Sequence, residues 1–102
     1  MGLLWADAAA DLLDPSVWHK SPAPVFASAH GQYGPGHNSF TTTPDGQTDL
    51  LVYHARNYRD IVGDPLHDPN RHARVQPFRW RADGLPDFAQ PLPDGPVPWG
   101  DA

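Results

Sequence analysis

The middle of the chain shows the alternation of apolar and polar residues that is typical of antiparallel β-strands. Three segments carry this pattern, at positions 38–43, 49–56 and 74–81. Successive side chains of a strand point to opposite faces of its sheet, so each segment predicts one strand. Two shorter extended pieces are predicted at positions 24–26 and 87–89. Together these segments predict an all-β fold of antiparallel meander sheets.

The residues between the strands have the chemistry of tight turns. Positions 44–47 read Pro-Asp-Gly-Gln, and Asp83-Gly84 follows the third strand. Proline fixes φ, Asp bonds to its own backbone and Gly allows a positive φ, so both sites predict turns between strands. Pro77 cannot donate to a ladder and predicts a sheet edge or a bulge. Residues 57–72 form a loop long enough to be functional or disordered.

The two ends of the chain have no strand pattern. Residues 6–13 are rich in Ala and Leu and end at Asp14-Pro15, which makes them the candidate for one short helix. Four prolines between positions 91 and 98 predict an irregular tail over residues 91–102.

The composition predicts a small core. Proline and glycine occupy 22 of the 102 positions, and only 20 residues are Leu, Ile, Val or Phe. That apolar share lies near the border below which charged chains tend to stay disordered. The length allows one small domain or a piece of a larger one.

Charge and residue usage exclude several classes of function. The net charge of −5 argues against nucleic-acid binding, and the absence of Cys excludes disulfides, thiol nucleophiles and Cys-based zinc sites. All twelve acidic residues are Asp, so no step that needs a Glu can be carried here. No segment resembles a secretory signal or a membrane span, and a genuine start at Met1 implies a cytoplasmic protein.

Residues 33–40 read Tyr-Gly-Pro-Gly-His-Asn-Ser-Phe, a sharp glycine–proline turn that delivers His37 to the start of a strand. This run resembles a signature in the last blades of the family 43 glycoside hydrolases, the five-bladed β-propeller arabinofuranosidases, arabinanases and xylosidases. Further motifs resemble the family in the same order, at residues 14–18, 20–22, 24–26, 51–56, 63–66, 68–72, 74–76, 80 and 83–86. The resemblance covers residues 3–95 and is most marked to exo-acting α-L-arabinofuranosidases.

The resemblance implies a partial five-bladed propeller. A blade takes roughly 45 residues, so the chain corresponds to about two C-terminal blades. Residues 1–15 are then a lead-in, residues 16–90 supply the blade strands and residues 91–102 form the tail.

The family hydrolyses glycosidic bonds with inversion, using two Asp residues and a Glu general acid on earlier blades. Inversion needs two carboxyl groups about 6.5–9.5 Å apart. No Asp here has the context of the family's catalytic set, so the chain is predicted to have no catalytic residue and to be inactive alone. The implied ligand is a pentose-containing oligosaccharide or polysaccharide. The alternative is a non-catalytic sugar-binding module that completes a propeller with the missing N-terminal blades or with a second copy.

Three polar residues are candidate site residues through the resemblance. His37 is implied to point into the central channel beside a calcium ion or a water cluster, although calcium prefers six to eight oxygen ligands. The alternative is a hydrogen-bonded His without a metal. Arg71 and Arg74 are implied to reach the sugar, because guanidinium groups suit hydroxyl and carboxylate recognition. Their alternative is pairing with loop carboxylates such as Asp64 or Asp68.

Aromatic and histidine residues complete the candidates. Tyr33 is a candidate sugar-binding aromatic or a core residue, and Phe40 is predicted to lie in the core. Trp18 and Trp80 are predicted to pack between blade sheets. A set of three histidines has no compact zinc-ligand spacing and is interpreted as incidental loop residues, at His54, His67 and His72.

Overall fold

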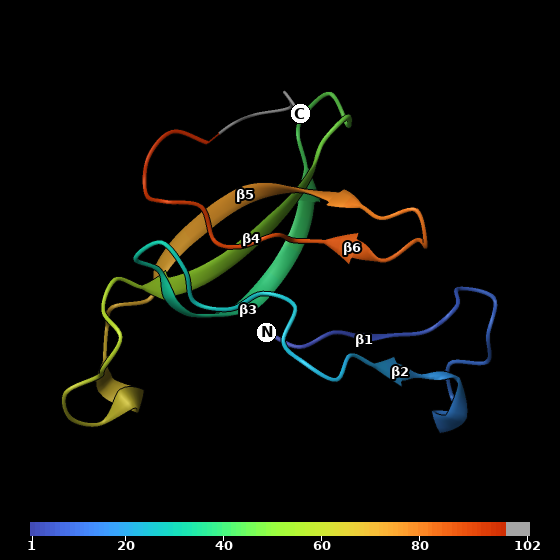
Figure 1. The fold of residues 1–102 in the computed structure, drawn as a ribbon, viewed down its shortest axis with the longest axis horizontal. Coiled ribbons are helices and arrows are strands. Elements are labelled where there is room, and N and C mark those ends of the chain that lie inside the picture. The colour runs from blue at the N-terminus through green and yellow to red at the C-terminus, as the bar shows by residue number, and fades with distance from the viewer. Residues whose placement is uncertain (98–102) are drawn as a thin grey trace.

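A four-stranded antiparallel meander dominates the computed structural model, which describes residues 1–97 (Figure 1). Its strands lie in sequence order and are β3 (Tyr33–Thr42), β4 (Asp49–Arg56), β5 (His72–Trp80) and β6 (Pro86–Asp87). The three predicted strands and both predicted turns are confirmed, although β3 begins five residues earlier than the pattern indicated. The predicted all-β, antiparallel class is therefore correct.

A second, two-stranded sheet pairs β1 (Leu4–Trp5) with β2 (His19–Lys20), and Figure 1 shows it beside the meander. The predicted lead-in thus contains a strand of its own. Two short 3-10 helices, η1 (Pro15–Val17) and η2 (Pro65–His67), interrupt the loops. No helix among residues 1–97 has the length and apolar character needed to cross a membrane.

The helix expected over residues 6–13 does not form. The Asp7 carboxylate accepts from the Ala9 amide at 2.9 Å, and the Asp11 carboxylate accepts from the Leu13 amide at 3.1 Å. Such local bonds offer the backbone an alternative to helical hydrogen bonding, which explains the turns found here.

The extended piece expected at residues 24–26 is a bend and not a strand. The Val25 amide donates to the Met1 carbonyl at 2.9 Å, and the Met1 ammonium donates to the Phe26 carbonyl at 2.7 Å. The chain start therefore holds this segment against the sheet.

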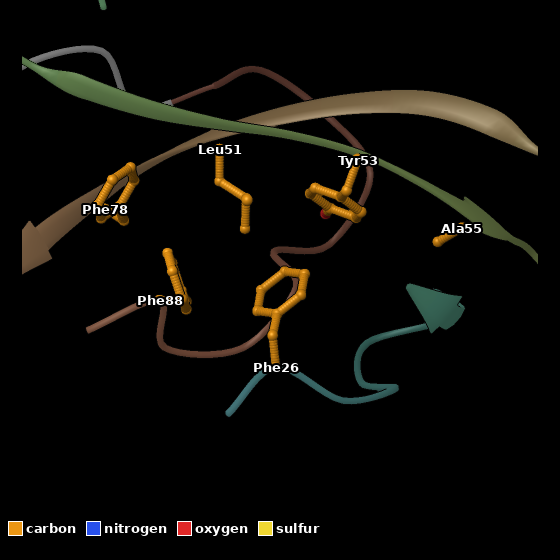
Figure 2. Packing of buried hydrophobic residues seen from close by; sticks show 6 residues of the cluster. All are labelled: Phe26, Leu51, Tyr53, Ala55, Phe78 and Phe88. Carbon is orange, nitrogen blue, oxygen red and sulfur yellow. The ribbon is translucent and has the colours of Figure 1, made fainter. Parts of the chain in front are cut away.

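The core lies on one face of the meander. Leu51, Tyr53 and Ala55 alternate along β4 and point to the same side, where phenylalanines from three segments pack against them (Figure 2). The phenylalanines are Phe26, Phe78 and Phe88. The Phe26 and Tyr53 rings meet edge to face at 4.9 Å. This core is small, as the composition predicted.

Three aromatic residues lie closer to solvent than expected. Phe40 was predicted in the core but is 59% exposed, although its ring stacks on Phe88 at 6.0 Å. Trp18 and Trp80, predicted between sheets, are 38% and 58% exposed. The indole of Trp80 donates to the Asp49 carboxylate at 2.7 Å. Phe40 and Trp80 line an open groove between β1 and the meander, which leaves both rings partly exposed to solvent.

Pro77 occupies an edge, as predicted. It pairs with Leu50 of β4, while β6 pairs only with Arg79 and Trp80. The stretch of β5 around Pro77 thus has one neighbouring strand, and the missing amide costs no ladder bond on the open side.

The described part of the tail, residues 91–97, contains no strand. The buried side-chain carboxamides of two glutamines, Gln32 and Gln76, hold it in place. Gln76 accepts from the Leu92 amide at 2.9 Å and donates to the Gln90 carbonyl at 3.0 Å. Gln32 donates to the Leu92 carbonyl at 2.6 Å. Residues 91–97 are irregular in the structure, and residues 98–102, the rest of the predicted tail, lie outside the described residues.

Candidate functional site

The glycine–proline segment breaks the regular pairing of β3 with β4. Register shifts occur between Tyr33 and Gly36 and again between Gly36 and Ser39. Gly34 has a φ of 61° and His37 a φ of 48°, so two residues of the motif lie in the left-handed region. A positive φ is uncommon for a residue with a side chain, and such positions cluster at functional sites.

Gly34 makes room for an arginine. A Cβ atom at this position would lie 2.5 Å from Nη1 of Arg56, which is the residue that ends β4. The Arg56 guanidinium therefore packs directly over the bare backbone of Gly34. Its Nη2 donates to the Arg59 carbonyl at 2.9 Å.

Replacing Gly34 with Ala is expected to lower the free energy of unfolding by about 1–2 kcal/mol, chiefly because of its positive φ, and to displace the guanidinium at the flexible end of Arg56. Gly31 is the matched control, since its φ is 79° and a Cβ there meets nothing within 4 Å. Gly31→Ala should cost about 1 kcal/mol. Urea denaturation of both variants measures the losses, and unchanged NMR signals of the Arg56 side chain in Gly34→Ala would contradict the proposed contact.

His37 and His54 face each other across the two strands. Their ring centroids are 6.0 Å apart and the rings are inclined by 68°. His37 is exposed, whereas His54 is half-buried. Burial lowers the pKa of His54, and the positive charges of Arg71 and His37 lower it further. The motif therefore places its histidine in a locally electropositive region of an acidic chain.

The loop between β4 and β5 is ordered by polar side chains. The Asn57 amide donates to Asn70 Oδ1 at 3.2 Å, and Asn70 Nδ2 donates to Asn57 Oδ1 at 2.9 Å. The Tyr58 hydroxyl donates to Asp68, and this bond is the main cause that lowers the pKa of Asp68. Arg71 Nη2 donates to the Pro65 carbonyl at 3.1 Å.

These elements enclose a cavity of about 330 Å³ at one end of the sheet. Its walls combine two arginines, one carboxylate and one carboxamide with a half-buried histidine. The lining residues are Gly34, His54, Arg56, Ile61, Pro65, Asp68, Asn70 and Arg71. A mixture of charged donors and acceptors of this kind suits a ligand that carries hydroxyl groups.

The predicted site residues do not all gather there. Arg71 lines the cavity, and Tyr33 pairs with Arg56 next to it. Arg74 pairs with Tyr53, so its side chain lies on the core face, opposite to His54. Arg74 forms an ion pair with Asp94 and donates from Nε to the Ala55 carbonyl at 3.2 Å. An aspartate therefore does pair with Arg74, but it comes from the tail and not from the loop.

A calcium ion at His37 does not fit the residues of this chain alone. Among residues 1–97, no group of three or more His, Cys, Asp or Glu side chains could hold a metal ion. His37 faces another imidazole, His54, whereas calcium prefers oxygen ligands. His54, His67 and His72 likewise form no three-residue metal site within these residues.

Arg56, Asp68 and Asn70 were missed as candidate site residues. Arg56 ends a predicted strand that contains His54, so the alternation already placed both on one face. No local signal indicated the contact of Arg56 with Gly34, since the two positions are 22 residues apart and the register is shifted between them.

The sequence matches the profile of the glycosyl hydrolases family 43 over residues 3–86. It is 60% identical to alpha-L-arabinofuranosidase 43 of Humicola insolens and 58% identical to an extracellular exo-alpha-(1->5)-L-arabinofuranosidase of Streptomyces avermitilis, over 96% of this chain in both cases. The chain spans about a fifth of the length of these curated relatives (21%).

A comparison with solved structures also finds an arabinofuranosidase. The structure of an alpha-L-arabinofuranosidase from Lactobacillus brevis matches 90% of this chain with a TM-score of 0.86 and 61% sequence identity. The match covers 29% of that structure. The similarity therefore extends through the sheets and the cavity described above, and most of each relative lies beyond it.

Proposed function

Because this chain belongs to family 43 of the glycosyl hydrolases, we propose that it is the C-terminal part of an arabinofuranosidase-type enzyme. The four-stranded meander β3–β6 is one blade of a five-bladed propeller in this proposal, and the pair β1–β2 belongs to the neighbouring blade. The chain thus accounts for about two blades, and the active enzyme needs the others.

One observation carries the proposal. The chain is 60% identical to the Humicola insolens relative over nearly its whole length, yet it spans 21% of that relative. Exposed aromatic rings agree with missing neighbours, since Phe40 and Trp80 are 59% and 58% exposed. These two rings line a groove of about 730 Å³ between β1 and the end of the meander.

The chain supplies binding groups in this proposal and no catalytic group. An inverting hydrolase protonates the leaving oxygen with one carboxylic acid and activates water with another. The sequence contains no Glu, so the family's general acid comes from the other blades. Arg71 and Tyr33 contact an arabinose-containing chain, and arabinose is favoured over xylose by the names of the relatives. His37 faces the propeller centre in this proposal, where a calcium ion would need oxygen ligands from water or the other blades.

A second candidate function is supported by the same groove. A blade with uncovered aromatic rings and an open strand edge can complete a propeller by adding to another chain or to a second copy. In this case the chain is an assembly module that binds sugar without hydrolysing it. Turnover does not separate this candidate from the first, but sedimentation does, because self-completion requires an oligomer.

We expect the purified 102-residue chain to release no chromophore from aryl α-L-arabinofuranoside or aryl β-xyloside above the buffer rate. The reason is that the catalytic carboxylates are outside it. The Humicola insolens relative, assayed in parallel, is the positive control. Hydrolysis that co-purifies with the chain and persists in Arg71→Ala and His37→Ala would overturn the assignment of the catalytic groups to other blades.

A further inference from the structure

The residues that line the cavity at the end of β4 include more positive than negative side chains. Arg56 and Arg71 both line it, and Asp68 is its one acidic residue. Neither arginine has an ion pair within 4.0 Å among residues 1–97. The lining therefore has a net charge of one positive unit with His54 neutral, in a chain whose overall charge is −5.

The two guanidinium groups also have donors to spare. Each guanidinium carries five N–H groups. Within residues 1–97, Arg56 donates one to Arg59, and Arg71 donates one to Pro65. The Arg56 Nε is buried and has no hydrogen-bond partner in the described part of the chain. Because this nitrogen has almost no accessible surface, the donors that Arg56 can offer to a ligand are those of its two Nη atoms.

The acceptors and the size of the cavity narrow the choice of ligand. Asp68 and Asn70 bring a carboxylate and a carboxamide to the wall. Each already bonds to a neighbour in the loop, Tyr58 or Asn57, and keeps further lone pairs that can accept from hydroxyls. The volume of about 330 Å³ lies at the low end of small-molecule sites, which span roughly 300–1,000 Å³. A single sugar ring is the size of ligand that this space suits.

We propose that the cavity between Arg56 and Arg71 binds a uronic acid, a sugar ring whose carboxylate meets the guanidinium groups and whose hydroxyls meet Asp68 and Asn70. A planar guanidinium matches a carboxylate in shape as well as in charge. One carboxylate also neutralises the single excess charge of the lining. The inference rests on the proposed function for its saccharide ligand and deepens it, because it adds an acidic sugar to the neutral arabinose of that proposal.

The 102-residue chain is titrated with D-galacturonate, D-galactose and acetate in separate experiments. Calorimetry and the NMR signals of the arginine side chains measure the binding. We expect D-galacturonate to bind at least about tenfold more tightly than D-galactose, because only the uronate makes a charge-assisted hydrogen bond to the guanidinium groups. It should also bind more tightly than acetate, which lacks the sugar hydroxyls. Equal affinity for galactose would show that the carboxylate is not recognised. Equal affinity for acetate would show that the sugar is not, and either result overturns the proposal.

Variants assign the binding to the cavity. Arg71 is exposed, so Arg71→Gln should leave the fold intact and weaken D-galacturonate binding by about tenfold. Arg56→Lys keeps the charge but loses the planar fork, and it should also weaken binding. Arg79→Gln is the matched control, because Arg79 is exposed and lies outside the cavity lining. Unchanged affinity in Arg71→Gln would overturn the assignment. These readouts need no hydrolysis, so they stay informative if the proposed arabinofuranosidase activity fails.

Discussion

Replacing Leu51 with Ala is expected to lower the free energy of unfolding by about 3–4 kcal/mol. Leu51 has no exposed surface and lies at the centre of the aromatic cluster, with Phe26, Phe78 and Phe88 nearby (Figure 2). Domains have a total free energy of unfolding of about 5–15 kcal/mol, and this core is small. The expected loss is therefore a large fraction of the total stability. Urea denaturation followed by circular dichroism measures the loss.

Leu66→Ala is the matched control for that substitution. Leu66 lies in the short helix η2 and is 74% exposed, so the same change of side chain should cost less than about 0.5 kcal/mol. If both variants lose the same stability, the cluster around Leu51 does not hold the sheet together.

A Humicola insolens arabinofuranosidase that lacks the segment matching this chain is expected to be inactive and to recover hydrolysis when the chain is added. The two proteins share 60% identity over that segment, and the structural relative superposes with a TM-score of 0.86. On this similarity we expect the chain to take the place of the deleted segment. Enzymes accelerate their reactions by about 10⁶-fold or more, so even about 1% of reassembled sites is detectable. Release of arabinose from an aryl arabinofuranoside measures the recovery.

Two variants of the chain make this reconstitution specific. Leu51→Ala should restore much less hydrolysis, because the expected loss of about 3–4 kcal/mol leaves less of the chain folded. Arg71→Gln should restore it with a raised KM, because it removes a proposed sugar contact without entering the core. A folded chain that leaves the truncated relative inactive would argue against the propeller-completing role.

The strands and turns followed from the sequence because their signals are local. The alternation over residues 49–56 places Leu51 and Tyr53 on one face, and both do lie in the core. The Pro-Asp-Gly turn forms where it was expected, with Asp45 accepting from the Gln47 amide at 3.0 Å. Each of these features depends on residues a few positions apart.

The predictions of a helix over residues 6–13 and of a buried Phe40 were wrong for different reasons. Asp7 and Asp11 bond to the local backbone, and this competition outweighed the helix propensity of the neighbouring Ala and Leu residues. The exposure of Phe40 depends on how closely neighbouring segments pack, and its ring lines an open groove between β1 and the meander. Burial is a property of the assembly around a residue and cannot be read from its type alone.

Some features of the candidate site also followed from the sequence, and others depended on the tertiary structure. The sequence by itself determined the all-β class, the strand segments and the family resemblance, since each rests on residue type and spacing along the chain. Only the tertiary structure decided that Arg71 lines the cavity while Arg74 pairs with Asp94 on the core face. It also brought Arg56 over Gly34, through a shifted register. A shift of one residue moves a side chain to the other face of a sheet, so contacts across strands depend on pairing that no local pattern specifies.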